Sequence, residues 1–140
     1  MALDGDDFGP SEISQTVTGL TAGESTTVSF YFAGAQQYGY TGATTEQLEV
    51  SLGGQSQLTP VLDNVSEGFT GWNLYTMTFT PTSSSEVLSF LAIGTPSGVP
   101  PMSLLADVSV SSVPEPSSLA LLGTGLAGLG SLMRRRFKKA

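Results

Sequence analysis

Six residues near the end of the chain have the spacing of a phosphate-binding loop. The stretch GTGLAG at 123–128 fits the pattern G-x-G-x-x-G, whose glycines let a backbone approach the pyrophosphate of a dinucleotide at the start of a helix. Such a site also needs a strand before the glycines and an acidic residue about 20 positions after them. The sequence has a basic cluster after the stretch and no carboxylate beyond Glu115. We therefore expect no nucleotide ligand.

The side chains that most often carry out catalysis are absent or unpaired. The chain has no cysteine and no histidine, which excludes thiol nucleophiles, Ser-His triads, disulfides and zinc sites with nitrogen or sulfur ligands. A glycosidase would need two carboxylates about 5–10 Å apart, one of them with a raised pKa. Glu46 and Glu49 are three positions apart on or near one expected strand, so we expect them to face opposite sides of it. The sequence predicts no enzyme.

Charge is strongly segregated along the 140 residues. All five basic residues lie in the last seven positions and all twelve acidic residues precede Leu119, so residues 1–133 carry −12 and the whole chain −7. A domain without lysine or arginine cannot neutralise phosphates. Nucleic acid is therefore not an expected partner.

A run of seventeen uncharged residues, Ser117–Met133, precedes the basic cluster. As a helix it would span roughly 25 Å, and arginines that snorkel to the interface can cover the difference from a hydrocarbon core of about 30 Å. Pro114 and Pro116 prevent the helix from extending backwards. The pattern predicts a single C-terminal transmembrane helix with its basic end in the cytoplasm. The alternative is a helix buried in the domain, but the run has no polar face.

The parts of this tail, taken in order, resemble a known signal. VPEP at 113–116, the apolar run and RRRFKK at 134–139 resemble the PEP-CTERM sorting signal of Gram-negative bacteria. The resemblance implies that a membrane-embedded exosortase recognises the chain and that residues 117–133 are a transient anchor. It makes Pro114, Glu115 and Pro116 the sorting motif. It makes the stop-transfer basic cluster Arg134, Arg135, Arg136, Lys138 and Lys139.

The same resemblance implies an export route. The precursor would lie in the inner membrane with its C terminus in the cytoplasm, and the mature protein would lie at the cell surface or in the extracellular matrix. An exported protein opens with a signal peptide, yet residues 1–14 have neither a basic n-region nor an apolar h-region. We expect a signal peptide and one or two further strands ahead of Ala2.

Residues 2–112 have the pattern of an all-β domain. Apolar and polar residues alternate in 13–20 and in 25–32, which we expect to form a hairpin around Ala22 and Gly23. Segments rich in glycine, proline and serine separate the later apolar runs. The sequence predicts an antiparallel β-sandwich of jelly-roll type over 1–112, ahead of a sorting signal over 113–140. Its further expected strands are 47–52, 73–80, 87–93 and 104–110.

This body resembles the jelly-roll domains of galactose-binding-like and carbohydrate-binding-module-like proteins. The resemblance lies in residues 13–30, 71–90 and 104–110. It implies a structural calcium site in which Asp107 joins acidic residues near the N terminus. Calcium takes 6–8 oxygen ligands, and the N-terminal strand that supplies partners in such domains is not evident here. A solvated acidic loop is therefore the favoured interpretation of Asp4, Asp6 and Asp7.

Sugar binding would need exposed aromatic rings with polar neighbours, because ring faces stack on the apolar faces of sugars. The loop AQQYGYTG at 35–42 offers Tyr38 and Tyr40, and GWNLY at 71–75 offers Trp72 and Tyr75. For Trp72 a place in the core is favoured over a role as a platform. The other expected core aromatics are Phe30, Phe79 and Phe90. The polar side chains that would bind sugar hydroxyls are Gln36, Gln37 and Asn73.

These observations favour a non-catalytic surface or matrix protein. An exosortase would sort it through its C-terminal signal, and its acidic β-domain would associate with extracellular polysaccharide. One alternative is a secreted carbohydrate-binding module with a specific glycan ligand. The other is a simple C-terminally anchored membrane protein.

Overall fold

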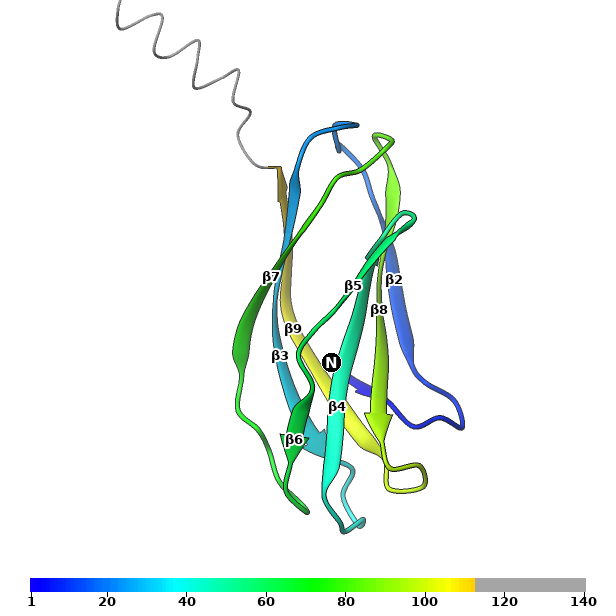
Figure 1. Cartoon of the computed structure of the whole chain (residues 1–140), viewed down its shortest axis with the longest axis vertical. Coiled ribbons are helices and arrows are strands. Elements are labelled where there is room, and N and C mark those ends of the chain that lie inside the picture. Colours follow the sequence, from blue (N-terminus) through cyan, green and yellow to red (C-terminus); the bar gives the residue numbers. More distant parts are fainter. Residues whose placement is uncertain (113–140) are drawn as a thin grey trace, which may run out of the picture.

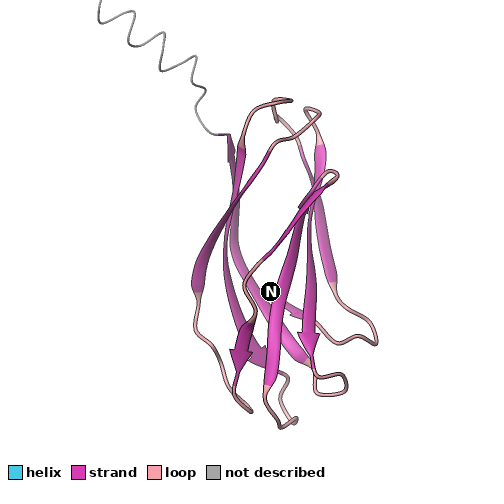
Figure 2. Ribbon diagram, in the orientation of Figure 1, coloured by secondary structure: helices cyan, strands magenta, loops and turns pink. Residues whose placement is uncertain are grey.

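The described part of the chain consists of strands and loops. The computed structural model describes residues 1–112, in which there is no helix (Figure 1, Figure 2). The strands are β1 (Ala2–Asp4), β2 (Glu12–Val17), β3 (Thr26–Gln36), β4 (Thr44–Leu52), β5 (Gln55–Leu58), β6 (Leu62–Asn64), β7 (Asn73–Phe79), β8 (Glu86–Thr95) and β9 (Pro101–Ser112).

Two antiparallel sheets form the two layers of a sandwich (Figure 1). One sheet has the order β1-β9-β3-β7, and the other has the order β2-β8-β4-β5, with β6 also paired to β4. β5 and β6 follow one another along β4, so they act as one broken strand. Counted as one, they leave eight strands. Successive strands lie in opposite sheets except for the hairpin of β4 with β5, which is jelly-roll topology. The predicted antiparallel β-sandwich is confirmed.

The core lies between the sheets and is built by alternate residues of the long strands. In β4 every second residue from Thr44 to Leu52 is buried, as expected for a strand with one face on the core. Phe30 of β3 meets Phe90 of β8 edge to face, with ring centroids 5.1 Å apart, so the two sheets contact through aromatic side chains. Phe79 is also buried. The prediction that these three phenylalanines are core residues is confirmed.

The predicted hairpin between 13–20 and 25–32 is wrong. β2 pairs with β8, whereas β3 pairs with β7 and β9, so the two segments lie in different sheets. Alternation specifies which side chains are buried but not which strand lies alongside. The connection 18–25 crosses between the layers, and its Leu20 is buried against the core. The Leu20 N–H donates to the carbonyl oxygen of Ser84 at 3.0 Å, which ties the crossing to the β7–β8 loop.

Most of the other predicted strands exist but have different ends. The predictions 47–52, 87–93 and 104–110 lie inside β4, β8 and β9, and 73–80 runs one residue past β7. The three short strands β1, β5 and β6 were not predicted, because three or four residues are too few to show the alternation of apolar and polar residues. The missed β1 lies beside β9, which shows that the N-terminal residues do form a strand.

The predicted sorting signal at 113–140 and the transmembrane helix within it lie outside the described residues. Among residues 1–112 no helix has the length and hydrophobicity needed to cross a membrane. The predicted domain boundary after residue 112 stays a prediction.

The segment 1–112, expressed alone, is expected to fold as an all-β domain. Both sheets and every member of the hydrophobic core lie within it. Far-ultraviolet circular dichroism should show a β-type spectrum that is lost in one cooperative thermal transition. A spectrum with substantial helix, or a thermal scan without a transition, would contradict this expectation.

Candidate functional site

Two loops with aromatic side chains meet at one end of the sandwich. Residues 37–43 join β3 to β4, and residues 65–72 join β6 to β7. The register between β3 and β9 places Gln36 beside Pro101 and Thr26 beside Ser112. Since β3 has 11 residues, the loops lie roughly 30 Å from Ser112, where the described chain ends.

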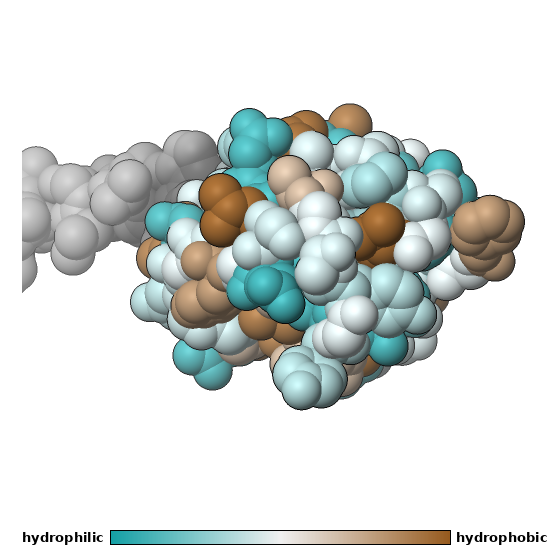
Figure 3. Space-filling view, turned by 90° about the horizontal axis from the view of Figure 1, so that it is seen from below, coloured by the Kyte–Doolittle hydropathy of each residue, from teal (hydrophilic) through white to brown (hydrophobic). Residues whose placement is uncertain are grey.

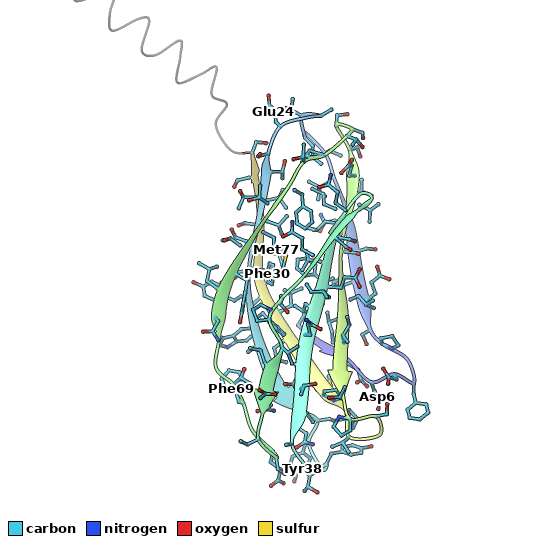
Figure 4. The ribbon with its side chains drawn as sticks, viewed as in Figure 1. Asp6, Glu24, Phe30, Tyr38, Phe69 and Met77 are labelled. Carbon is cyan, nitrogen blue, oxygen red and sulfur yellow. The ribbon has the colours of Figure 1, made fainter. Side chains whose placement is uncertain are left out.

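The labelled side chains in Figure 4 show this arrangement. Tyr38 and Phe69 lie at the lower end of the view, and Glu24 lies at the upper end (Figure 4). We call the lower end the aromatic end and define it by Tyr38, Tyr40, Phe69 and Trp72.

Hydrogen bonds fasten the β6–β7 loop to β3 and to the β3–β4 loop. The Thr70 N–H donates to the carbonyl oxygen of Gly34 at 2.9 Å, and the Gly34 N–H donates to Thr70 Oγ1 at 2.8 Å. The Gly42 N–H donates to Ser66 Oγ at 2.8 Å. The two aromatic loops are therefore held as one unit.

Four aromatic rings of these loops are open to solvent. Tyr38 is 100% exposed, Phe69 54%, Trp72 46% and Tyr40 40%. Phe69 and Trp72 meet edge to face with ring centroids 6.2 Å apart. The favoured interpretation of Trp72 as a core residue is therefore wrong, because Trp72 lies in the loop just before β7 begins. Its exposed ring is available as a platform.

Tyr75 differs from its predicted role as an exposed sugar-binding residue. It lies in β7 on the face that packs against the core, and its ring stacks on Phe30 with centroids 6.0 Å apart. It also contacts Phe32, at 5.8 Å. Alternation explains this position, because Tyr75, Met77 and Phe79 share one face of the strand. Tyr75 supports the core beneath the loops rather than offering a free ring.

Phe69 was not among the predicted site residues. The pattern that could have indicated it is GFTGW at 68–72, in which glycines flank aromatic residues between two strands, as they do in QYGYTG at 37–42. Glycine-rich connections lie on the surface, so bulky side chains within them are candidates for binding.

A pocket of about 230 Å³ lies between the first residues of β4, the end of β8 and β6. Much of its wall is apolar, and the carboxylate of Asp63 and the hydroxyls of Thr45 and Thr95 add polar groups that can exchange hydrogen bonds with sugar hydroxyls. The exposed residues Gln37 and Asn73 add polar side chains on the neighbouring segments. The lining residues are Ala43, Thr44, Thr45, Asp63, Asn64, Val65 and Thr95.

Glu46 lies beneath this end of the domain, with its side chain fully buried between the sheets. Burial raises the pKa of Glu46 from 4.5 to about 7, the hydrogen bond from Thr44 lowers it in part, and the charge of Asp63 raises it. Glu46 Oε2 has no hydrogen-bond partner among residues 1–112. Gly34 leaves the space for this carboxyl, since a Cβ at that position would overlap it. A substrate cannot reach a carboxyl so enclosed.

The structure does not bring Asp107 together with the acidic residues of the N terminus. Asp107 lies at a β-bulge of β9 with φ of 49°, a conformation that aspartate tolerates better than most residues. Asp6 instead accepts a hydrogen bond at 2.8 Å from the Gly98 N–H, in the β8–β9 loop. Residues 1–112 contain no group of three acidic side chains that could hold a metal ion. Calcium binding at Asp107 stays a prediction.

Figure 3 views the molecule from below, so it shows the aromatic end. Hydrophobic residues are interspersed there with weakly polar and hydrophilic ones rather than forming one continuous apolar patch (Figure 3). Stable protein interfaces usually have an apolar centre. A mixed surface of rings and polar groups suits a sugar better.

Comparison with known proteins identifies the C-terminal segment. The family described as the PEP-CTERM protein-sorting motif matches residues 112–136. The chain therefore carries this motif, as its resemblance predicted, and the basic residues up to Arg136 fall within the match. A search of curated proteins found no match.

Solved structures resemble the β-sandwich. The C-terminal domain of EclA, a sugar-binding protein, is 19% identical with a TM-score of 0.51, and the match covers 71% of this chain and 65% of that one. A structure described as CBM4 is 18% identical with a TM-score of 0.39, covering 73% and 61%. The enzymatically active domain of bacteriophage CBA120 tailspike protein 4 is 15% identical with a TM-score of 0.42, covering 80% and 15%. The chain thus spans less than two thirds of each of these structures, and the likeness to the EclA domain is one of fold.

Proposed function

We propose that the protein is a non-catalytic, exported surface or matrix protein whose aromatic end binds extracellular polysaccharide. Its C-terminal motif would deliver it, and its β-sandwich would bind the glycan. The observation that carries the glycan part is the set of four exposed aromatic rings at one end of the sandwich, beside a pocket of about 230 Å³.

The sorting motif supports delivery to the cell envelope or surface. In the proposed route the precursor lies in the inner membrane, with the apolar run 117–133 as its anchor and the basic cluster 134–139 in the cytoplasm. An exosortase then recognises Pro114, Glu115 and Pro116 and processes the chain. The aromatic end lies about 30 Å from Ser112 along β3, so the anchor would not cover it.

Three observations support a glycan as the ligand. Exposed Tyr and Trp rings offer apolar faces for stacking, and their polar atoms stay available for hydrogen bonds. The pocket wall carries the exposed carboxylate of Asp63 and the hydroxyls of Thr45 and Thr95, whose oxygens lie 2.6 Å apart. The sugar-binding EclA domain, which shares the fold, makes a glycan a reasonable ligand class to test.

A catalytic role has less support. Glu46 has the raised pKa that a general acid needs, but its side chain is fully buried. Glu49 lies on the other face of β4. We therefore keep two non-catalytic alternatives, which are a carbohydrate-binding module selective for one glycan and a simple C-terminally anchored protein. We also keep a structural calcium ion at Asp107 as a proposal, and titration of the protein with calcium tests it.

Replacing the exposed rings is expected to weaken glycan binding. Tyr38→Ala and Trp72→Ala should each weaken binding roughly tenfold, since each loses a stacking surface worth about 1 kcal/mol or slightly more. The measurement is affinity electrophoresis or calorimetry with cellulose-type glucan, xylan, galactomannan and starch.

The matched control is Val87→Ala. Val87 is an exposed apolar residue of β8 and follows Glu86. Glu86 pairs with Val17, the last residue of β2, so this control lies at the end of the sandwich away from the aromatic rings. It should bind like the unsubstituted protein. If no polysaccharide binds, or if Tyr38→Ala and Trp72→Ala bind unchanged, the proposed site is wrong.

A further inference from the structure

The aromatic end carries negative charge without any balancing positive side chain. Eleven of the twelve carboxylates, all but Glu115, lie in residues 1–112, and no lysine or arginine occurs before Arg134. The described domain therefore contains no cationic side chain that could pair with an acidic ligand.

Several of these carboxylates lie next to the rings. Asp63 is exposed and forms part of the pocket wall. Glu67 is exposed in the same loop as Phe69, and its N–H donates to Gln36 Oε1 at 2.7 Å, which holds that turn against the end of β3.

Two further carboxylates belong to the same end. Asp6 accepts a hydrogen bond from the Gly98 N–H at 2.8 Å, and Asp7 accepts one from Ser97 Oγ at 3.1 Å. Both therefore lie against the β8–β9 loop, which connects to β9 beside Gln36.

We infer that the glycan bound by the aromatic end is uncharged, and that polysaccharides rich in carboxylate or sulfate groups are rejected. This inference rests on the proposed glycan binding and names the class of its ligand. Arginine and lysine supply the charge-assisted hydrogen bonds that most strongly stabilise a bound carboxylate or sulfate, and residues 1–112 contain neither. Each carboxylate or sulfate group of such a polysaccharide would approach the negative side chains of Asp63 and Glu67. Like charges repel over roughly the Debye length, which is about 10 Å at 0.1 M salt.

The test uses one polysaccharide in three forms that share a backbone. The neutral polysaccharide that binds best among cellulose-type glucan, xylan, galactomannan and starch is etherified at part of its hydroxyl positions with carboxymethyl groups, which leaves the backbone intact. A portion is then converted to the corresponding neutral amides. Binding is measured with the full chain in which Arg134, Arg135, Arg136, Lys138 and Lys139 are replaced by serine, so that the tail does not attract the carboxylate form. The protein is kept in solution with a mild detergent, and EDTA is present so that no divalent cation bridges the charges.

The carboxylate form is expected to bind at least tenfold more weakly than the amide form at 20 mM NaCl. At 0.5 M NaCl, where screening is strong, the two affinities should agree within about twofold. The double variant Asp63→Asn with Glu67→Gln should reduce the low-salt difference at least threefold. Glu24→Gln, at the other end of the sandwich, should leave it unchanged (Figure 4).

The outcomes separate the inference from the function on which it rests. If none of the four polysaccharides binds, the proposed function itself fails. If the neutral form binds and the carboxylate form binds equally well or better, glycan binding stands and the inference is overturned. If the carboxylate form binds weakly but neither salt nor the double variant reduces the difference, charge is not the cause and the inference is also overturned.

Discussion

Glu46→Gln is expected to remove a pH-dependent loss of stability that the unsubstituted domain shows between about pH 4.5 and pH 7. Glu46 is neutral in both the folded and the unfolded state below pH 4.5, so burial then carries no charge penalty. Because the folded-state pKa is raised to about 7, the unfolded state ionises first as the pH rises. The folded state is destabilised until its own carboxyl ionises, and the loss then stays constant.

The size of the effect follows from the shift. A rise from 4.5 to about 7 corresponds to about 3 kcal/mol of unfolding free energy. The difference in stability between Glu46→Gln and the unsubstituted domain should therefore change by up to this amount between pH 4 and pH 8, in favour of the variant at the higher pH. Urea unfolding of residues 1–112 at several pH values measures it.

Glu49→Gln is the matched control, because Glu49 lies on the same strand but on its partly exposed outer face. Its stability should follow that of the unsubstituted domain across the pH range. Parallel pH profiles for Glu46→Gln and the unsubstituted domain would show that the buried carboxyl is not the source of the dependence.

Substitution of Glu115 is expected to abolish sorting without abolishing membrane insertion. Insertion depends on the apolar run and its flanking charges, which Glu115→Ala and Pro114→Ala leave intact. If an exosortase recognises the motif, these variants should stay in the inner membrane with the tail uncleaved, and the unsubstituted protein should lose the tail and reach the surface. Intact mass and cell fractionation of an exported full-length protein, in strains with and without exosortase, measure the outcome.

Two further variants distinguish recognition from anchoring. Replacement of Arg134, Arg135 and Arg136 by serine should instead give a mixture of membrane orientations, because it removes positive charge that holds the C terminus in the cytoplasm. Ser118→Ala, which changes neither motif nor charge, should be processed normally. If the surface form keeps its tail in both strains, the segment is an anchor only and the sorting proposal is wrong.

The all-β sandwich and the sorting motif could both be predicted from local patterns of residues. Strict alternation in segments such as 25–32 leaves one apolar face to bury, which is enough to predict a sandwich. The tail is a local signal, since Pro-Glu-Pro, an apolar run and a basic cluster are contiguous, and the match at 112–136 confirms it. The segregation of all basic residues into the last seven positions, on which the ligand class depends, is likewise visible without a structure.

The pairing of the strands and the exposure of individual side chains could not be predicted in this way, and they follow from the three-dimensional fold. Alternation is the same whether 13–20 pairs with 25–32 or, as found, β2 pairs with β8 in the other sheet. For the same reason the exposure of Trp72 and Tyr75 was predicted wrongly. An aromatic residue near the start of a strand is buried or exposed according to where the strand begins. The spacing of Glu46 and Glu49 predicted only that they face opposite sides of a strand. The enclosure of Glu46 depends on Gly34, from a strand of the opposite sheet. Such contacts join residues far apart in the chain, so no local pattern encodes them.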